Sequence, residues 1–133
     1  MKKLMAVGLA MWAGAASAEV LYVQTAKGHQ CVGDRFQINA PMEVLYQDRK
    51  CDLPLAHAKD MRAYLFRAKD TVMRGCWGKT LDGTYVIVDQ NGTVSNSASN
   101  AYVTAKTVSG SEAVVTVSPN QGTAYAKAME MCP

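Results

Sequence analysis

Four cysteines constrain the fold of this 133-residue chain more than any other feature. They stand at Cys31, Cys51, Cys76 and Cys132, with no Cys-x-x-Cys pair among them and neither histidine at ligand spacing. This spacing argues against zinc, so we expect no metal and no cofactor. An even number of cysteines also argues against a free nucleophilic thiol. In an oxidising compartment such a set forms disulfide bonds, which help a small domain to stabilise its core.

The N-terminus has the three parts of an export signal. Lys2 and Lys3 form a cationic start, residues 4–16 are uncharged and mostly apolar, and Ala16-Ser17-Ala18 is a small-x-small cleavage site. We therefore predict a signal peptide over residues 1–18 and a single small β-rich domain over residues 19–133. The lysine-only start and the compact length are typical of bacterial signals, which predicts a periplasmic or secreted protein.

Removal of this signal changes what the charge implies. It takes away Lys2 and Lys3 and no acid, so the formal charge falls from +3 to +1. A nearly balanced charge excludes a nucleic-acid binder that acts through overall charge. No later segment approaches about 18 consecutive apolar residues, so we expect no transmembrane segment after cleavage.

Export predicts that the four cysteines form two disulfide bonds, for which three pairings are possible. We favour Cys51–Cys76, which closes a loop in the most structured part of the chain, and Cys31–Cys132, which ties the tail back to the start. Each closure stabilises the fold by roughly 3–5 kcal/mol in the chain-entropy model.

Short segments rich in β-branched and aromatic residues recur along the chain and predict strands. These segments are 20–25, 42–47, 62–67, 71–77, 84–90, 101–108 and 113–118. Turn residues separate neighbours at Asp82-Gly83, Asn91-Gly92 and Ser109-Gly110. We predict a mainly β, disulfide-stabilised domain with one or two short helices, built as a small antiparallel meander, sandwich or barrel-like fold.

Residues 55–69 allow two interpretations. Ala58, Met61, Leu65 and Ala68 recur at helical spacing, whereas residues 62–67 also alternate as a strand does. The hairpin pattern that follows favours a meander of 62–67, 71–77 and 84–90. A short helix over residues 55–60 can still precede this meander. A second short helix is predicted over 124–131, and the polar residues 95–100 are predicted to be a linker to the C-terminal hairpin.

The pattern Cys51…Gly75-Cys76-Trp77…Asp82-Gly83, followed by Asn91-Gly92, resembles a group of short exported proteobacterial proteins of unknown function. The resemblance covers roughly residues 19–95. It implies that Cys51 and Cys76 pair and that Trp77 packs beside them. The chain departs from the pattern in Gln90-Asn91-Gly92, where an acidic residue before glycine is more usual, and in its Val/Thr-rich tail with Cys132. The group has no assigned activity to carry over.

Positive charge is concentrated in the middle of the chain. Between Asp48 and Lys79 eight basic residues stand against four aspartates. If the basic residues share a face with aromatic side chains, they form a binding surface for a protein partner or an anionic envelope polymer. The candidate binding residues are Arg62, Tyr64, Phe66, Arg67, Arg74 and Trp77. The alternative interpretation is an ordinary solvated outer face of the strands.

No nucleophile elbow, His-Glu-x-x-His motif or phosphate-binding glycine loop is present in the sequence. Our leading hypothesis is an exported, non-enzymatic domain that binds a protein, such as an envelope enzyme, or an envelope polymer. A second hypothesis is a structural envelope component whose Val/Thr-rich tail strands add to a partner's sheet edge. A third is a small hydrolase that uses His29 or His57 as its general acid–base. The oligomeric state stays open.

Overall fold

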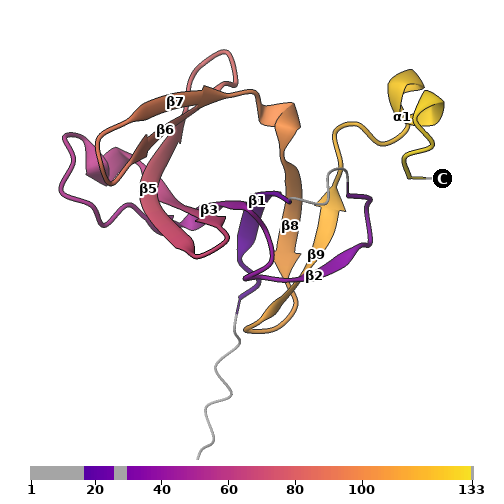
Figure 1. Cartoon of the computed structure of the whole chain (residues 1–133), viewed down its shortest axis with the longest axis horizontal. Helices are drawn as coiled ribbons and strands as arrows, with labels where there is room; N and C mark the ends of the chain where they lie inside the picture. Colours follow the sequence, from indigo (N-terminus) through magenta and orange to yellow (C-terminus); the bar gives the residue numbers. More distant parts are fainter. Residues whose placement is uncertain (1–16, 26–29, 133) are drawn as a thin grey trace, which may run out of the picture.

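The computed structural model describes residues 17–25 and 30–132. Within these residues, nine strands form one antiparallel sheet in the order β2-β9-β8-β1-β3-β4-β5-β6-β7. The strands are β1 (Val20–Gln24), β2 (Arg35–Gln37), β3 (Glu43–Lys50), β4 (Arg62–Ala68), β5 (Thr71–Lys79), β6 (Tyr85–Asp89), β7 (Val94–Ser97), β8 (Val103–Thr107) and β9 (Glu112–Val117). In Figure 1, β5, β6 and β7 lie on one side of β1 and β3, and β8, β9 and β2 lie on the other. The mainly β fold predicted from the sequence is confirmed.

The sheet buries a hydrophobic cluster on each of its two faces. Along β1, Leu21 and Val23 belong to the first cluster, while Tyr22 between them packs against the second. Successive side chains of a strand point to opposite faces, so the shared central strands must be apolar on both. The first cluster also contains Val44, Tyr46, Ala105 and Ala113, and the second contains Leu45, Tyr64, Trp77, Tyr85, Ile87 and Tyr102.

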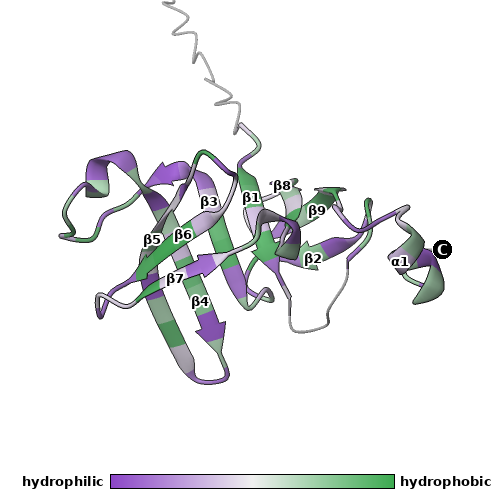
Figure 2. Cartoon of the chain, turned by 90° about the horizontal axis from the view of Figure 1, so that it is seen from above, coloured by the Kyte–Doolittle hydropathy of each residue, from purple (hydrophilic) through white to green (hydrophobic). Residues whose placement is uncertain are grey.

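This two-sided burial explains why β3 does not alternate as an ordinary surface strand does. Val44, Leu45 and Tyr46 are buried in succession, and the following residues up to Lys50 are exposed. A strand that is covered on both faces has a continuous apolar run instead of an alternating one. Figure 2 shows hydrophobic and hydrophilic residues mixed along β4 and β5.

Both favoured disulfides are present. Cys51 and Cys76 are joined with their Cα atoms 5.3 Å apart, and Cys31 and Cys132 with theirs 5.5 Å apart. The first bond fastens the end of β3 to the middle of β5, where Cys76 is fully buried. The second fastens the tail to the segment before β2.

The predicted meander and the short terminal helix are confirmed, and three local details differ from the predictions. The predicted linker at 95–100 contains most of β7, which pairs with β6 from Val88↔Val94 to Tyr85↔Ser97, followed by a 3-10 turn over Ser99–Ala101. The short helix over 55–60 is only a 3-10 turn, Ala58–Asp60, because His57 has a left-handed φ of 59°. The terminal helix α1 (Ala124–Ala128) is shorter than predicted, since Glu130 also has a left-handed φ, of 53°.

Candidate functional site: a basic cavity beside the Cys51–Cys76 bond

The register of β4 and β5 divides the six candidate binding residues between the two faces of the sheet. Arg62 pairs with Trp77, so these two side chains share a face with Tyr64 and Phe66. Arg74 pairs with Leu65 and lies on the opposite face, as does Arg67. The structure therefore does not bring the six together on one surface.

The aromatic members of the set belong to the second hydrophobic cluster. Tyr64 is 7% exposed and Trp77 is 5% exposed, and Phe66 packs against the same cluster. The indole Nε1 of Trp77 donates a hydrogen bond of 3.0 Å to the Tyr46 carbonyl, at the point where the β3–β4 register shifts and no β4 residue pairs with Tyr46. The ring of Trp77 also lies 5.2 Å from that of Tyr85. Their positions indicate that these aromatic residues hold the sheet together.

Arg74 lines a cavity of about 220 Å³ next to the Cys51–Cys76 disulfide, which we call the basic cavity. Its lining includes Tyr46, Arg49, Lys50, Asp52, Leu65 and Arg74. The disulfide places this lining, because Lys50 and Asp52 flank Cys51 in the chain while Arg74 comes two residues before Cys76. The cavity thus has three cationic side chains and one acid on a covalently fixed frame.

Two of these cations make ion pairs, of which Arg74–Asp52 is the more open to solvent. Arg74 pairs with Asp52, with 53% and 66% of the two side chains exposed. Arg49 donates two hydrogen bonds to Glu19, of 2.7 and 2.9 Å, and its guanidinium lies 4.1 Å from the centre of the Tyr46 ring. The bond to Glu19 raises the pKa of Arg49. Lys50 has no ion-pair partner within residues 17–25 and 30–132.

An exposed ion pair contributes little to stability, so Arg74 can exchange Asp52 for another acid at small cost. A carboxylate, phosphate or sulfate group of a ligand offers an arginine the same bidentate contact that a protein carboxylate does. The basic cavity can therefore bind one acidic group, with Lys50 as the cation that is already available.

A half-buried carboxylate hydrogen-bonded to two buried tyrosines lies on the other face, and nothing in the sequence marked it. Glu43 accepts hydrogen bonds from the hydroxyls of Tyr64, at 2.9 Å, and Tyr102, at 2.6 Å. Burial, followed by the negative charge of Glu43, raises the pKa of Tyr64, and burial with the Glu43 hydrogen bond raises the pKa of Tyr102. Both tyrosines stay protonated at neutral pH, so both hydroxyls can donate to Glu43. Their hydrogen bonds link β3, β4 and the start of β8.

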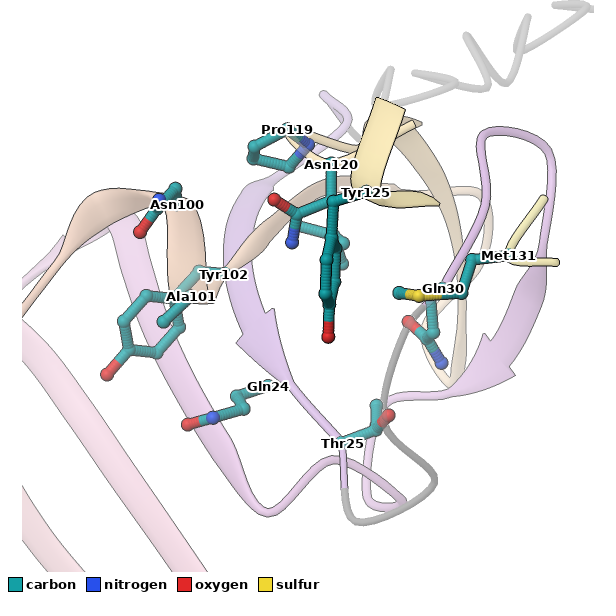
Figure 3. Close-up of a pocket in the computed structure, with 11 residues that line it drawn as sticks. Gln24, Thr25, Gln30, Asn100, Ala101, Tyr102, Pro119, Asn120, Tyr125 and Met131 are labelled. Atoms are coloured by element: carbon teal, nitrogen blue, oxygen red, sulfur yellow. The ribbon is translucent and has the colours of Figure 1, made fainter. Parts of the chain in front are cut away.

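Figure 3 shows a second cavity, of about 230 Å³, which we call the amide cleft. It lies between the end of β1, the 3-10 turn at Ser99–Ala101 and the C-terminal segment. Its side chains include Gln24, Gln30, Asn100, Asn120, Tyr125 and Met131. Uncharged amides have no distinctive spacing, so the sequence offered no signal for this cleft.

Of the two histidines in the hydrolase hypothesis, one lies within the described residues. His57 is an exposed side chain, and its Nδ1 lies 3.9 Å from the Asp60 carboxylate; His29 lies outside the described residues. Within the described ranges no three His, Cys, Asp or Glu side chains are grouped so as to hold a metal ion. The helices of those ranges are also too short or too polar to cross a membrane.

No known protein family, curated protein or solved structure matches the chain. The resemblance to short exported proteobacterial proteins therefore stays a prediction.

Proposed function

We propose that this protein is an exported bacterial domain, periplasmic or secreted, that binds an acidic protein or an anionic envelope polymer through the basic cavity. The observation that carries this proposal is the grouping of Arg49, Lys50 and Arg74 around one cavity beside a disulfide. A rigid frame lowers the entropy lost on binding, because the cations need little ordering when the ligand arrives.

Two further observations are consistent with export. The disulfides join all four cysteines. The sheet begins immediately after the predicted cleavage site, since the backbone N–H of Glu19 donates to Thr107 Oγ1 at 2.8 Å and that of Val20 donates to Asp48 Oδ2 at 3.0 Å. Cleavage before Glu19 would leave every strand intact.

The envelope-component hypothesis requires a free sheet edge. The Val/Thr-rich strands β8 and β9 have neighbours on both sides, so β2 and β7 are the edge strands of the sheet. Assembly by strand addition would therefore have to use β2 or β7 instead of the tail strands.

The proposal is tested by measuring binding of the mature exported protein to poly-L-glutamate and to polygalacturonate, with neutral dextran as a blank. N-terminal sequencing of the same preparation should begin at Glu19. We expect saturable binding of at least one polyanion, and a loss of at least about tenfold in affinity for Arg74→Ala, since a hydrogen bond to a charged group contributes roughly 1.5–3 kcal/mol.

Arg35→Ala is the matched control. Arg35 is also an exposed arginine in an ion pair, with Glu112 at 2.9 Å, but it lies on β2 outside the basic cavity. Its removal should change affinity by less than about twofold, well below the tenfold that corresponds to 1.4 kcal/mol. If neither polyanion binds, or if both variants weaken binding equally, the basic cavity is not the binding site.

A further inference from the structure

The amide cleft differs from the basic cavity because its lining carries no charged side chain among the described residues. Four of its side chains are primary amides: those of Gln24, Gln30, Asn100 and Asn120. Each amide carries two N–H donors and one carbonyl acceptor. Such a lining favours a neutral ligand that has many donors and acceptors of its own.

An aromatic ring stands in the middle of the amide cleft. Figure 3 shows the Tyr125 side chain between Tyr102 on one side and Gln30 and Met131 on the other. Tyr125 is 62% exposed, although a ring of this size normally buries its apolar faces. The exposed ring offers a flat apolar surface within reach of polar groups on several sides.

One amide oxygen of the cleft lacks a hydrogen-bond partner among the described residues. This atom is Oε1 of Gln30, which is buried. Leaving a buried acceptor unpaired costs about 1–3 kcal/mol, so most such groups in proteins have a partner. If the Gln30 side chain turns so that Oε1 faces the cleft, a ligand hydroxyl or N–H that donates to this oxygen would remove that cost.

The walls of the cleft are held together before any ligand binds. Gln30 and Met131 are the immediate neighbours of Cys31 and Cys132, which form a disulfide. Ser118 Oγ donates to the Gln30 carbonyl at 2.7 Å, and the Val32 N–H donates to Gln121 Oε1 at 2.8 Å. These bonds dock the C-terminal segment against residues 30–32, so little ordering remains to be done on binding.

We infer that the amide cleft binds a neutral saccharide unit. A sugar ring has hydroxyl groups around its edge for the amides and C–H groups on its face for the Tyr125 ring, and a cleft of about 230 Å³ is comparable in size with one such ring. An acidic ligand would find no cation among the described residues of this lining. The inference rests on different residues from the proposed function and stands or falls separately from it.

Calorimetric titration of the mature, disulfide-bonded protein with chitotetraose, maltotetraose and tetraglycine tests the inference. The first two probes distinguish acetylated from plain sugars, and the peptide represents the competing class of neutral ligand. We expect saturable binding of at least one sugar and none of tetraglycine. Tyr125→Ala should lower sugar affinity at least about tenfold, whereas Tyr125→Phe, which keeps the ring, should stay within about threefold of the native protein.

Met129→Ala is the matched control, because Met129 follows the same short helix and is similarly exposed, at 58%, yet does not line the cleft. Its affinity should equal that of the native protein. The inference is overturned if neither sugar binds, if tetraglycine binds instead, or if Tyr125→Ala binds as tightly as Met129→Ala.

Discussion

Gly75 shows how closely β4, β5 and β6 approach one another. A Cβ atom at this position would lie 2.7 Å from the Val88 carbonyl oxygen and 2.8 Å from the Tyr64 ring. Tyr64 is the β4 residue opposite Gly75, so its ring occupies the space that a side chain at Gly75 would need. The glycine before Cys76 is thus required by packing.

We expect Gly75→Ala to lower the free energy of unfolding by roughly 1–3 kcal/mol, because overpacking a filled site forces its neighbours to move. Gly78→Ala is the control on the same strand, where nothing lies within 4 Å of the added atom. It should be neutral or slightly stabilising. Urea unfolding of both variants makes the comparison, and equal midpoints would show that the space around Gly75 is not filled.

The tyrosines around Glu43 make stability depend on pH in the alkaline range. Unfolded tyrosine ionises near pH 10. Because burial and Glu43 raise the pKa of Tyr64 and Tyr102 in the folded state, unfolding releases protons above that pH. Their contribution is therefore complete below about pH 10 and is lost progressively as the pH rises further.

Urea midpoints at pH 8 and pH 11 measure this dependence. The native protein should lose stability between the two values, and the double variant Tyr64→Phe/Tyr102→Phe should lose clearly less, whatever its stability at pH 8. The same loss in both proteins would assign the alkaline sensitivity to other groups.

Single-residue roles were harder to predict than strands. Tyr64 and Trp77 stood among basic residues in the sequence, which suggested a surface, yet both are buried. The sequence of β4 alternates, but alternation does not say which face is covered when each face has its own hydrophobic cluster. Arg74 does line the basic cavity. Its face follows from its pairing with Leu65, and this pairing is visible only in the strand register.

At the scale of elements, the strands with aromatic and β-branched residues were predicted and the two edge strands were not. All of β7 except its last residue is exposed, and its sequence is mostly serine and asparagine. Backbone hydrogen bonds to β6 hold it, and these leave no mark on side-chain pattern. The other edge strand, β2, has only three residues, too few to show a period.

The helix α1 depends on its connection to the rest of the chain. It has five residues, of which Ala126 alone is buried, and an isolated helix of this length is unstable in water. Thr123 caps it by accepting a hydrogen bond from the Ala126 N–H at 3.1 Å. The Cys31–Cys132 bond ties the chain beyond α1 to the segment before β2.

We expect the double variant Cys31→Ser/Cys132→Ser to release this segment while the sheet stays folded. Hydrogen exchange should become fast at residues 126–131 and remain slow at the amides of β1, β3 and β4. The double variant Cys51→Ser/Cys76→Ser is the comparison, and it should accelerate exchange within the sheet because Cys76 is fully buried there. Unchanged protection at 126–131 would contradict this assignment.

At the scale of the whole molecule, fold class and both disulfides could be predicted, but the two-sided core could not. Pairing β1 with both β3 and β8 brings the C-terminal hairpin beside the first strand, a contact between distant parts of the chain. No local pattern encodes such a contact. The basic cavity arises in the same way, because one disulfide joins the end of β3 to β5.

We propose that this frame serves to bind an acidic partner at the basic cavity. An NMR titration of isotope-labelled mature protein, with whichever of poly-L-glutamate and polygalacturonate binds more tightly, locates the binding site. We predict that amide shifts change at residues 49–52 and 74–75, and that about 0.5 M salt reverses the changes by screening the charges. Absent shifts, or shifts confined to other parts of the sheet, would contradict the claim.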